Sequence, residues 1–264
     1  MRQYLRLSGL RTGTARPPID LSVIDRALGP IPGFAFLMDP GQIAADGAVL
    51  NRVDGTMKMP RNTTPAAAPA YPDAPFAGGG VFANGQPSIQ LAEASRRSLM
   101  PDVDLTAEEW SVFAYIRLSA VSADTQELIA AAPDYTVSAG ETGPRMGFTP
   151  TGTAAVIWSR GSAVDANRRL AYTPASGFMG REAALLFTFS VQNGLAIFVD
   201  GVREAYSAAA KEPLTRGMLR GQWRFFRGIN ADLGLTGILA TDLGRDSMAG
   251  YRTRLFEGLA QHYG

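Results

Sequence analysis

The sequence feature that most constrains the fold is a pair of short apolar runs joined by an Asn-Gly step. The runs span residues 184–191 and 195–199 and flank Asn193-Gly194. This arrangement predicts a β-hairpin with a type I′ turn, because Asn and Gly both tolerate a positive φ. Asp200-Gly201 supplies a second tight turn just downstream. Two strands alone cannot bury this much apolar surface, so a larger antiparallel sheet must surround the hairpin.

The rest of the chain repeats the pattern of a short apolar segment followed by a turn. Strands at roughly ten-residue spacing with Gly or Pro turns between them predict a sandwich or barrel, and no alternation of strands with helices is visible. Besides the hairpin and a strand within 99–118, we expect strands at 34–38, 48–53, 127–131, 145–149, 154–160, 223–227 and 235–241.

The strand within 99–118 has two different faces. One face is wholly apolar and consists of Trp110, Val112, Ala114, Ile116 and Leu118. The other face is mixed and consists of Ser111, Phe113, Tyr115 and Arg117. A strand of this kind is typical of an antiparallel sheet that packs on one side and is partly open on the other.

The two ends of the chain differ from the middle. Prolines at 17, 18, 30 and 32 interrupt residues 1–33, which we interpret as an arm that packs on the protein or on a partner; a frayed tail is the alternative. Residues 246–263 predict one C-terminal helix lying along an edge of the sandwich. Its apolar stripe comprises Met248, Tyr251, Leu255 and Leu259.

The composition excludes several classes of function. The chain has 264 residues, no cysteine and a single histidine, His262, which argues against disulfides, thiolate chemistry, a Ser-His-Asp triad and a multi-histidine metal site. Lys and Arg number 25 against 24 Asp and Glu, so nothing favours nucleic acid or an anionic membrane as a partner. The sequence also shows neither a secretory signal nor a run of about 18 apolar residues long enough for a membrane span.

Catalytic patterns are equally scarce. Glycosidases need two carboxylates facing one cleft, whereas Glu108 and Glu109 are adjacent and would point to opposite faces of a strand. Asp200 and Asp232 are better explained as turn residues. We therefore predict that the protein is not an enzyme and needs no cofactor; a structural calcium ion is conceivable, with no ligands assigned. A polysaccharide-degrading enzyme is the weaker alternative.

Carbohydrate binding needs little more than an exposed aromatic ring with a planar polar group beside it. An aromatic residue and an arginine two positions apart on a strand share one face. This criterion selects Tyr115 with Arg117 and Trp158 with Arg160. Each aromatic residue could instead belong to the core, with its arginine at the rim of the sandwich.

Three segments resemble laminin-G-like (concanavalin A-like) jelly-roll domains of tailed-phage and prophage particle proteins. They are the strand–turn–strand LAIFVDGVREA at 195–205, the strand NGQPSIQL at 84–91 and the ending EGLAQHYG at 257–264. The resemblance covers about residues 34–264. The ending departs from the family at Gly258, where an aromatic residue is usual.

The resemblance implies an all-β fold, an antiparallel jelly-roll β-sandwich over 34–264, with the arm at 1–33 and the helix at 246–263. It implies a non-enzymatic structural component of a phage or phage-like particle (a head decoration, spike, fibre or tail protein) that binds host surface glycans. A carbohydrate-binding module for host polysaccharide is the alternative. We expect a homo-oligomer on the particle surface, assembled in the bacterial cytoplasm, with the arm contacting other particle proteins.

Overall fold

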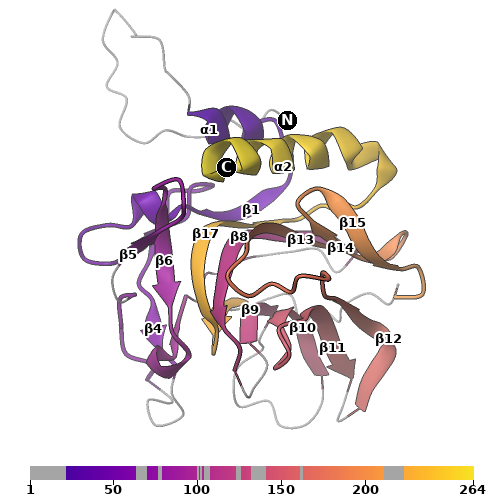
Figure 1. Cartoon of the computed structure of the whole chain (residues 1–264), viewed down its shortest axis with the longest axis horizontal. Helices are drawn as coiled ribbons and strands as arrows, with labels where there is room; N and C mark the ends of the chain where they lie inside the picture. Colours follow the sequence, from indigo (N-terminus) through magenta and orange to yellow (C-terminus); the bar gives the residue numbers. More distant parts are fainter. Residues whose placement is uncertain are drawn as a thin grey trace, which may run out of the picture.

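The structure is a computed structural model in which two antiparallel sheets face each other across a core (Figure 1). It describes residues 22–63, 70–76, 79–99, 101, 103, 108–122, 126–131, 141–160, 163–210 and 223–264. Within these ranges, the description covers only the backbone of residues 130–131, 141–144, 156–160, 163–169, 223–225 and 227. The predicted all-β sandwich with a C-terminal helix is confirmed.

The larger sheet has eight strands, and β8 lies at its centre. In spatial order the strands are β15 (Val202–Ser207), β14 (Gly194–Val199), β13 (Glu182–Ser190), β8 (Glu109–Ala120), β17 (Asn230–Leu239), β6 (Pro87–Leu91) and β5 (Gly79–Val81). The eighth strand, β1 (Phe34–Met38), pairs with β17. Strand β15 is therefore the outermost strand on one side.

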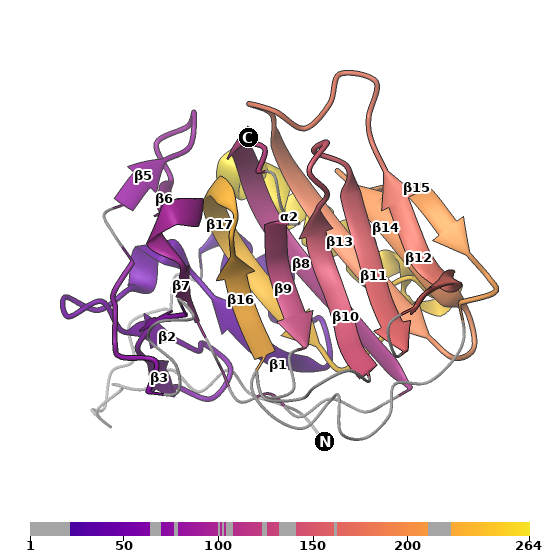
Figure 2. The same cartoon turned by 90° about the horizontal axis from the view of Figure 1, so that it is seen from below.

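The smaller sheet has five strands and lies in front of the larger one in the view from below (Figure 2). Its order is β12 (Ala163–Tyr172), β11 (Ala154–Arg160), β10 (Glu141–Phe148), β9 (Gln126–Ala131) and β16 (Trp223–Arg227). Two short ladders flank the sandwich: β2 (Val49–Leu50) with β3 (Met57–Lys58), and β4 (Arg61–Asn62) with β7 (Arg97–Ser98). In the described part of the chain, the α-helices are α1 (Val23–Leu28) and α2 (Ala249–Tyr263).

The main core lies between the two sheets and uses the apolar faces that the sequence predicts. Every second residue of β8, from Trp110 to Leu118, is buried there together with alternate residues of β13 and β14. Trp110 is fully buried and stacks on Phe189 with 5.7 Å between ring centroids. Burial of this area drives the two sheets together.

A second core lies on the other face of the larger sheet, beneath the helices. Phe113 and Tyr115 of β8 pack here against Leu255, Leu259 and other residues of α2. The prediction of a partly open second face is therefore wrong at Phe113 and Tyr115, where α2 covers this face rather than an edge of the sandwich. The physical reason is that the aromatic residues of the mixed face need apolar cover, which a helix with one apolar stripe supplies. Tyr251 falls outside the buried stripe and is 37% exposed.

The central hairpin forms as predicted, but its two turns differ from the expectation. Ser190 pairs with Gly194, so the first turn is a three-residue loop closed by Gly194 at φ +88°, and the predicted type I′ turn there is wrong. The two-residue turn with positive φ at both positions occurs at Asp200 (+50°) and Gly201 (+90°). Sequence pattern alone does not distinguish two- from three-residue loops at Asn-Gly steps.

The described part of the N-terminal arm belongs to the second core. Helix α1 packs on α2, and its Ile24 and Leu28 are buried. The helices touch where a Cβ at Gly258 would overlap the Cβ of Ala27. Gly258, where the resembling family carries an aromatic residue, therefore provides the space that α1 occupies. Among the described residues, no helix is long and apolar enough to cross a membrane.

Candidate functional site

Tyr115, predicted to contact carbohydrate, lies on the mixed face of β8 but has little free ring surface. It is 8% exposed, and its ring stacks on Tyr263 of α2 with 4.0 Å between centroids and 8° between planes. The ring of Phe82 lies edge-on to it at 5.0 Å. Burial and the neighbouring Glu182 carboxylate raise the pKa of Tyr115 to about 12. In this arrangement the tyrosine works as a core residue beneath α2.

Arg117 shares this face, as the sequence predicted, and its donors are occupied by neighbouring strands. Nε and Nη2 donate to Oδ2 of Asp232 at 3.0 and 2.6 Å, and Nη1 donates to Oε1 of Glu182 at 3.1 Å. Nη2 also donates to the Val81 carbonyl at 3.1 Å. The hydrogen bond to Asp232 is the main cause that raises the pKa of Arg117. The guanidinium thus ties β8 to β5, β13 and β17.

This cluster corrects one assignment made from the sequence. Asp232 lies within β17, with its side chain 10% exposed, and is not a turn residue; Asp200 does occupy a turn. Asp232 and Glu182 form a carboxylate pair contributed by two strands far apart in the sequence, so no local motif could reveal it. Both carboxylates bind the same arginine, which makes the cluster an ion-pair network.

The second predicted pair, Trp158 and Arg160, lies on β11 of the smaller sheet. Arg160 is opposite Glu141 of β10 and Ala163 of β12. The side chains of Trp158 and Arg160 lie outside the described part of the structure, so sugar contact by this pair stays a prediction.

A third aromatic–arginine pair, missed by the sequence criterion, lies on β15. Tyr206 is 48% exposed, and the guanidinium carbon of Arg203 is 5.0 Å from its ring centroid. The Tyr206 hydroxyl donates to the Asn193 carbonyl at 2.7 Å, which fixes the ring at the hairpin loop. This pair is the open aromatic–arginine combination that carbohydrate binding requires.

A β-bulge places Arg203 and Tyr206 on the same face although they are three residues apart. Tyr206 is opposite Ala196 and Arg203 is opposite Phe198, and the extra residue between them on β15 shifts the register. Ala196 and Phe198 both belong to the core beneath the helices, so the pair lies on the helix side of the sheet. In a regular strand, residues three apart point to opposite faces, which is why a two-residue spacing rule misses this pair.

Positive charge gathers around the pair. Arg252 of α2 lies over the Phe198 ring, 4.7 Å from its centroid, and donates to the Leu243 carbonyl. Burial lowers the pKa of Arg252, and the charge of Arg203 lowers it further. The helix side of β14 and β15 therefore presents an exposed tyrosine beside two arginines.

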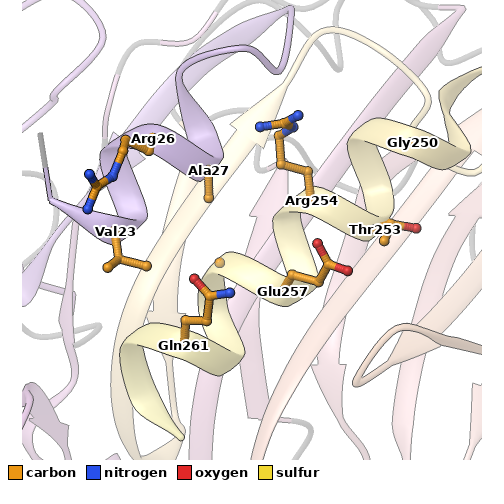
Figure 3. Close-up of a pocket in the computed structure, with 9 residues that line it drawn as sticks. Val23, Arg26, Ala27, Gly250, Thr253, Arg254, Glu257 and Gln261 are labelled. Atoms are coloured by element: carbon orange, nitrogen blue, oxygen red, sulfur yellow. The ribbon is translucent and has the colours of Figure 1, made fainter.

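A polar hollow lies between the two helices (Figure 3). It has a volume of about 560 Å³ and is lined by Val23, Arg26, Ala27, Gly250, Thr253, Arg254, Glu257, Gly258 and Gln261. In Figure 3, Arg254 extends from α2 toward α1, and Gln261 extends into the gap below Ala27. No local sequence pattern predicted this site, because the packing of α1 against α2 creates it.

The described residues show no metal site. Within the described ranges, no group of three or more His, Cys, Asp or Glu side chains is placed to hold a metal ion. The calcium ion considered from the sequence stays untested.

Comparison with known proteins identifies the fold and nothing finer. No protein-family model matches the sequence, and no curated protein matches it. Among solved structures, the botulinum neurotoxin serotype D binding domain is similar at a TM-score of 0.58 and 12% identity, over 88% of this chain and 53% of that chain. The serotype D ligand-binding domain in complex with N-acetylneuraminic acid is similar at a TM-score of 0.57 and 12% identity, over 90% of this chain and 53% of that chain.

A sialidase from Trypanosoma rangeli is similar at a TM-score of 0.52 and 11% identity, over 88% of this chain and 34% of that chain. The chain thus spans about half or less of the length of each of these structures. At such low identity the likeness shows a shared β-sandwich fold.

Proposed function

We propose that this protein is a non-enzymatic glycan-binding domain that contacts sugar through Arg203 and Tyr206. The observation that carries the proposal is the open Tyr206 ring, 48% exposed and held beside the Arg203 guanidinium. The ring offers an apolar face for the C–H groups of a sugar, and the guanidinium donates to its hydroxyls. The ring is already fixed by its hydroxyl, so little side-chain entropy is lost on binding.

The fold supports this proposal without deciding it. One similar structure is the serotype D ligand-binding domain in complex with N-acetylneuraminic acid, and another is the receptor-binding domain of botulinum neurotoxin D. The two carboxylates that the fold brings together at Arg117, those of Glu182 and Asp232, are both bound to its guanidinium. A domain that binds glycans and leaves them intact agrees with both observations.

Binding of neutral and acidic polysaccharides to the purified chain tests the proposal. Tyr206→Ala and Arg203→Gln should each weaken binding by at least about tenfold, equivalent to 1.4 kcal/mol. Tyr251→Ala is the matched control, because Tyr251 is also an exposed tyrosine and has no arginine over its ring within the described part. Equal binding by all three variants would exclude this site. Weaker binding in a chelator would point to the calcium ion.

We further propose that the domain is a structural component of a phage or phage-like particle and assembles there as a homo-oligomer. The support is the resemblance of the segments at 84–91, 195–205 and 257–264. Removal of residues 1–21 keeps Ile24 and Leu28 in place and should leave the sandwich folded while preventing incorporation into particles. Thermal unfolding and particle co-purification measure these two outcomes, and a truncated chain that still assembles would exclude the arm as anchor.

A further inference from the structure

The hollow between α1 and α2 contains polar side chains that no other part of the described structure uses. Arg26 comes from α1, and Arg254, Glu257 and Gln261 come from α2. Within the described residues, none of the four takes part in a side-chain hydrogen bond or an ion pair. All four side chains are available to a ligand.

Other arginines in the described structure are engaged differently. Arg52, Arg117, Arg181 and Arg245 each form an ion pair with a carboxylate. Arg26 and Arg254 line the same hollow, and Glu257 is the single carboxylate among its lining residues. The hollow therefore carries a net formal charge of +1 from these three side chains, in a chain whose total is also +1.

The shape of the hollow is fixed by backbone packing. Gly258 lets α2 approach Ala27 of α1 closely, since a Cβ at this position would overlap the Cβ of Ala27. Ile24 and Leu28 anchor α1 from below. The volume of about 560 Å³ is within the range of small-molecule sites, which is ≈ 300–1,000 Å³.

We infer that this hollow binds an acidic sugar unit. Guanidinium groups suit carboxylates because they donate two parallel hydrogen bonds, and Arg254, which extends from α2 toward α1, would take the carboxylate. Glu257 accepts from sugar hydroxyls, Gln261 both accepts and donates, and the apolar surface of Val23 and Ala27 meets the C–H groups. The inference rests on the proposed glycan-binding function, and it adds a second contact that shares no residue with Arg203 and Tyr206.

Galacturonate and galactose form a matched pair of probes, because they differ only in the carboxylate. Titration of the full chain, followed by NMR chemical shifts, should show galacturonate binding at least about tenfold tighter than galactose, with affinity that falls as salt rises. Arg254→Gln should weaken galacturonate binding severalfold and more than it weakens galactose binding, whereas Arg26→Gln, whose side chain points away from Arg254, should have a smaller effect. Arg61→Gln, at an exposed arginine outside the hollow, is the control.

The outcomes separate this inference from the proposed function. Equal affinities for the two sugars, or galacturonate binding that is unaffected by both hollow variants, would overturn the inference. If Tyr206→Ala still abolishes binding of neutral glycans in that case, the proposed function stands. If no sugar binds, both fail. Because Arg26 and Arg254 are exposed, both glutamine variants should fold, which thermal unfolding checks.

Discussion

Two aromatic–arginine pairs lie on the same face of the same sheet and differ in exposure. Tyr115 and Arg117 lie on the central strand β8, where α2 covers the ring and two carboxylates bind the guanidinium. Arg203 and Tyr206 lie on the outermost strand β15, where the ring is 48% exposed. The comparison shows that residue type and spacing select candidate pairs, whereas the position of the strand in the sheet decides whether a pair is covered or open.

Truncation of Tyr115 and of Tyr206 should give the largest difference in the free energy of unfolding. Tyr115→Ala should lower the free energy of unfolding by about 3–5 kcal/mol, because it leaves a cavity between Phe82 and Tyr263. Tyr206→Ala should lower it by less than about 1 kcal/mol. Urea unfolding of both variants measures the difference. Equal losses would mean that Tyr206 is as much a core residue as Tyr115.

Substitution of Arg117 should also destabilise the protein more than substitution of Arg203, although the difference should be smaller than for the tyrosines. Arg117→Met leaves Glu182 and Asp232 without their counter-ion, and we expect a loss of about 2–3 kcal/mol, below the range for a fully buried pair because Arg117 is 29% exposed. Arg203→Met should change stability by under about 0.5 kcal/mol. Denaturant titrations at low and high salt test both values. An Arg117→Met variant as stable as the wild type would show that the network contributes nothing.

The buried tyrosine also predicts a pH dependence. The pKa of Tyr115 is raised from 10.0 to about 12, so between these values the folded state keeps a proton that the unfolded state releases. Stability should therefore be fully present below pH 10 and fall as the pH rises through this window, by up to about 1.4 kcal/mol per unit.

Unfolding of the wild type and of Tyr115→Phe at several pH values from 9 to 11.5 tests this linkage. Phenylalanine keeps the ring stacking and removes the titrating hydroxyl, so the slope should become shallower in the variant. Burial also raises the pKa of Tyr263, which adds a slope of the same sign that persists in Tyr115→Phe. Identical slopes in the two proteins would contradict the assignment to Tyr115.

Removal of the bulge should have a small effect on both stability and binding. Deletion of Glu204 makes β15 regular and leaves Arg203 two positions from Tyr206, so the two side chains stay on the same face. Stability should change by less than about 1 kcal/mol on this edge strand, and glycan affinity should stay close to that of the wild type. Glu204→Ala keeps the extra residue and is the control. A loss of affinity in the deletion variant as large as that of Arg203→Gln would show that a shared face is not sufficient for binding.

The sequence pattern predicted the sandwich because strand alternation and turn residues are short-range signals. The alternation along 110–118, the hairpin at 184–199 and the strand at 34–38 all match the structure, since a period of two specifies which side chains share a face. The strand β12 was missed: its sequence, AVDANRRLAY, is too polar for an apolar run. The cover of the second face by α1 and α2 was missed as well, because it depends on contacts between the two ends of the chain.

The candidate sites were less predictable than the fold. The spacing rule found Tyr115 and Arg117. The burial of Tyr115, however, depends on Tyr263, which is 148 residues away in the sequence and contacts both Tyr115 and Phe82 in the folded protein. Arg203 and Tyr206 violate the spacing rule because one inserted residue reverses the alternation. The hollow depends on Gly258 meeting Ala27 across almost the whole chain.

The sequence by itself determined the antiparallel sandwich, the faces of its central strands and the C-terminal helix, because short-range periodicity and turn residues encode them. The tertiary structure alone decided which aromatic–arginine pair is covered and which is open. It also decided where unpaired charges meet. Exposure and pairing are properties of residues brought together from distant segments, and no local pattern carries that information.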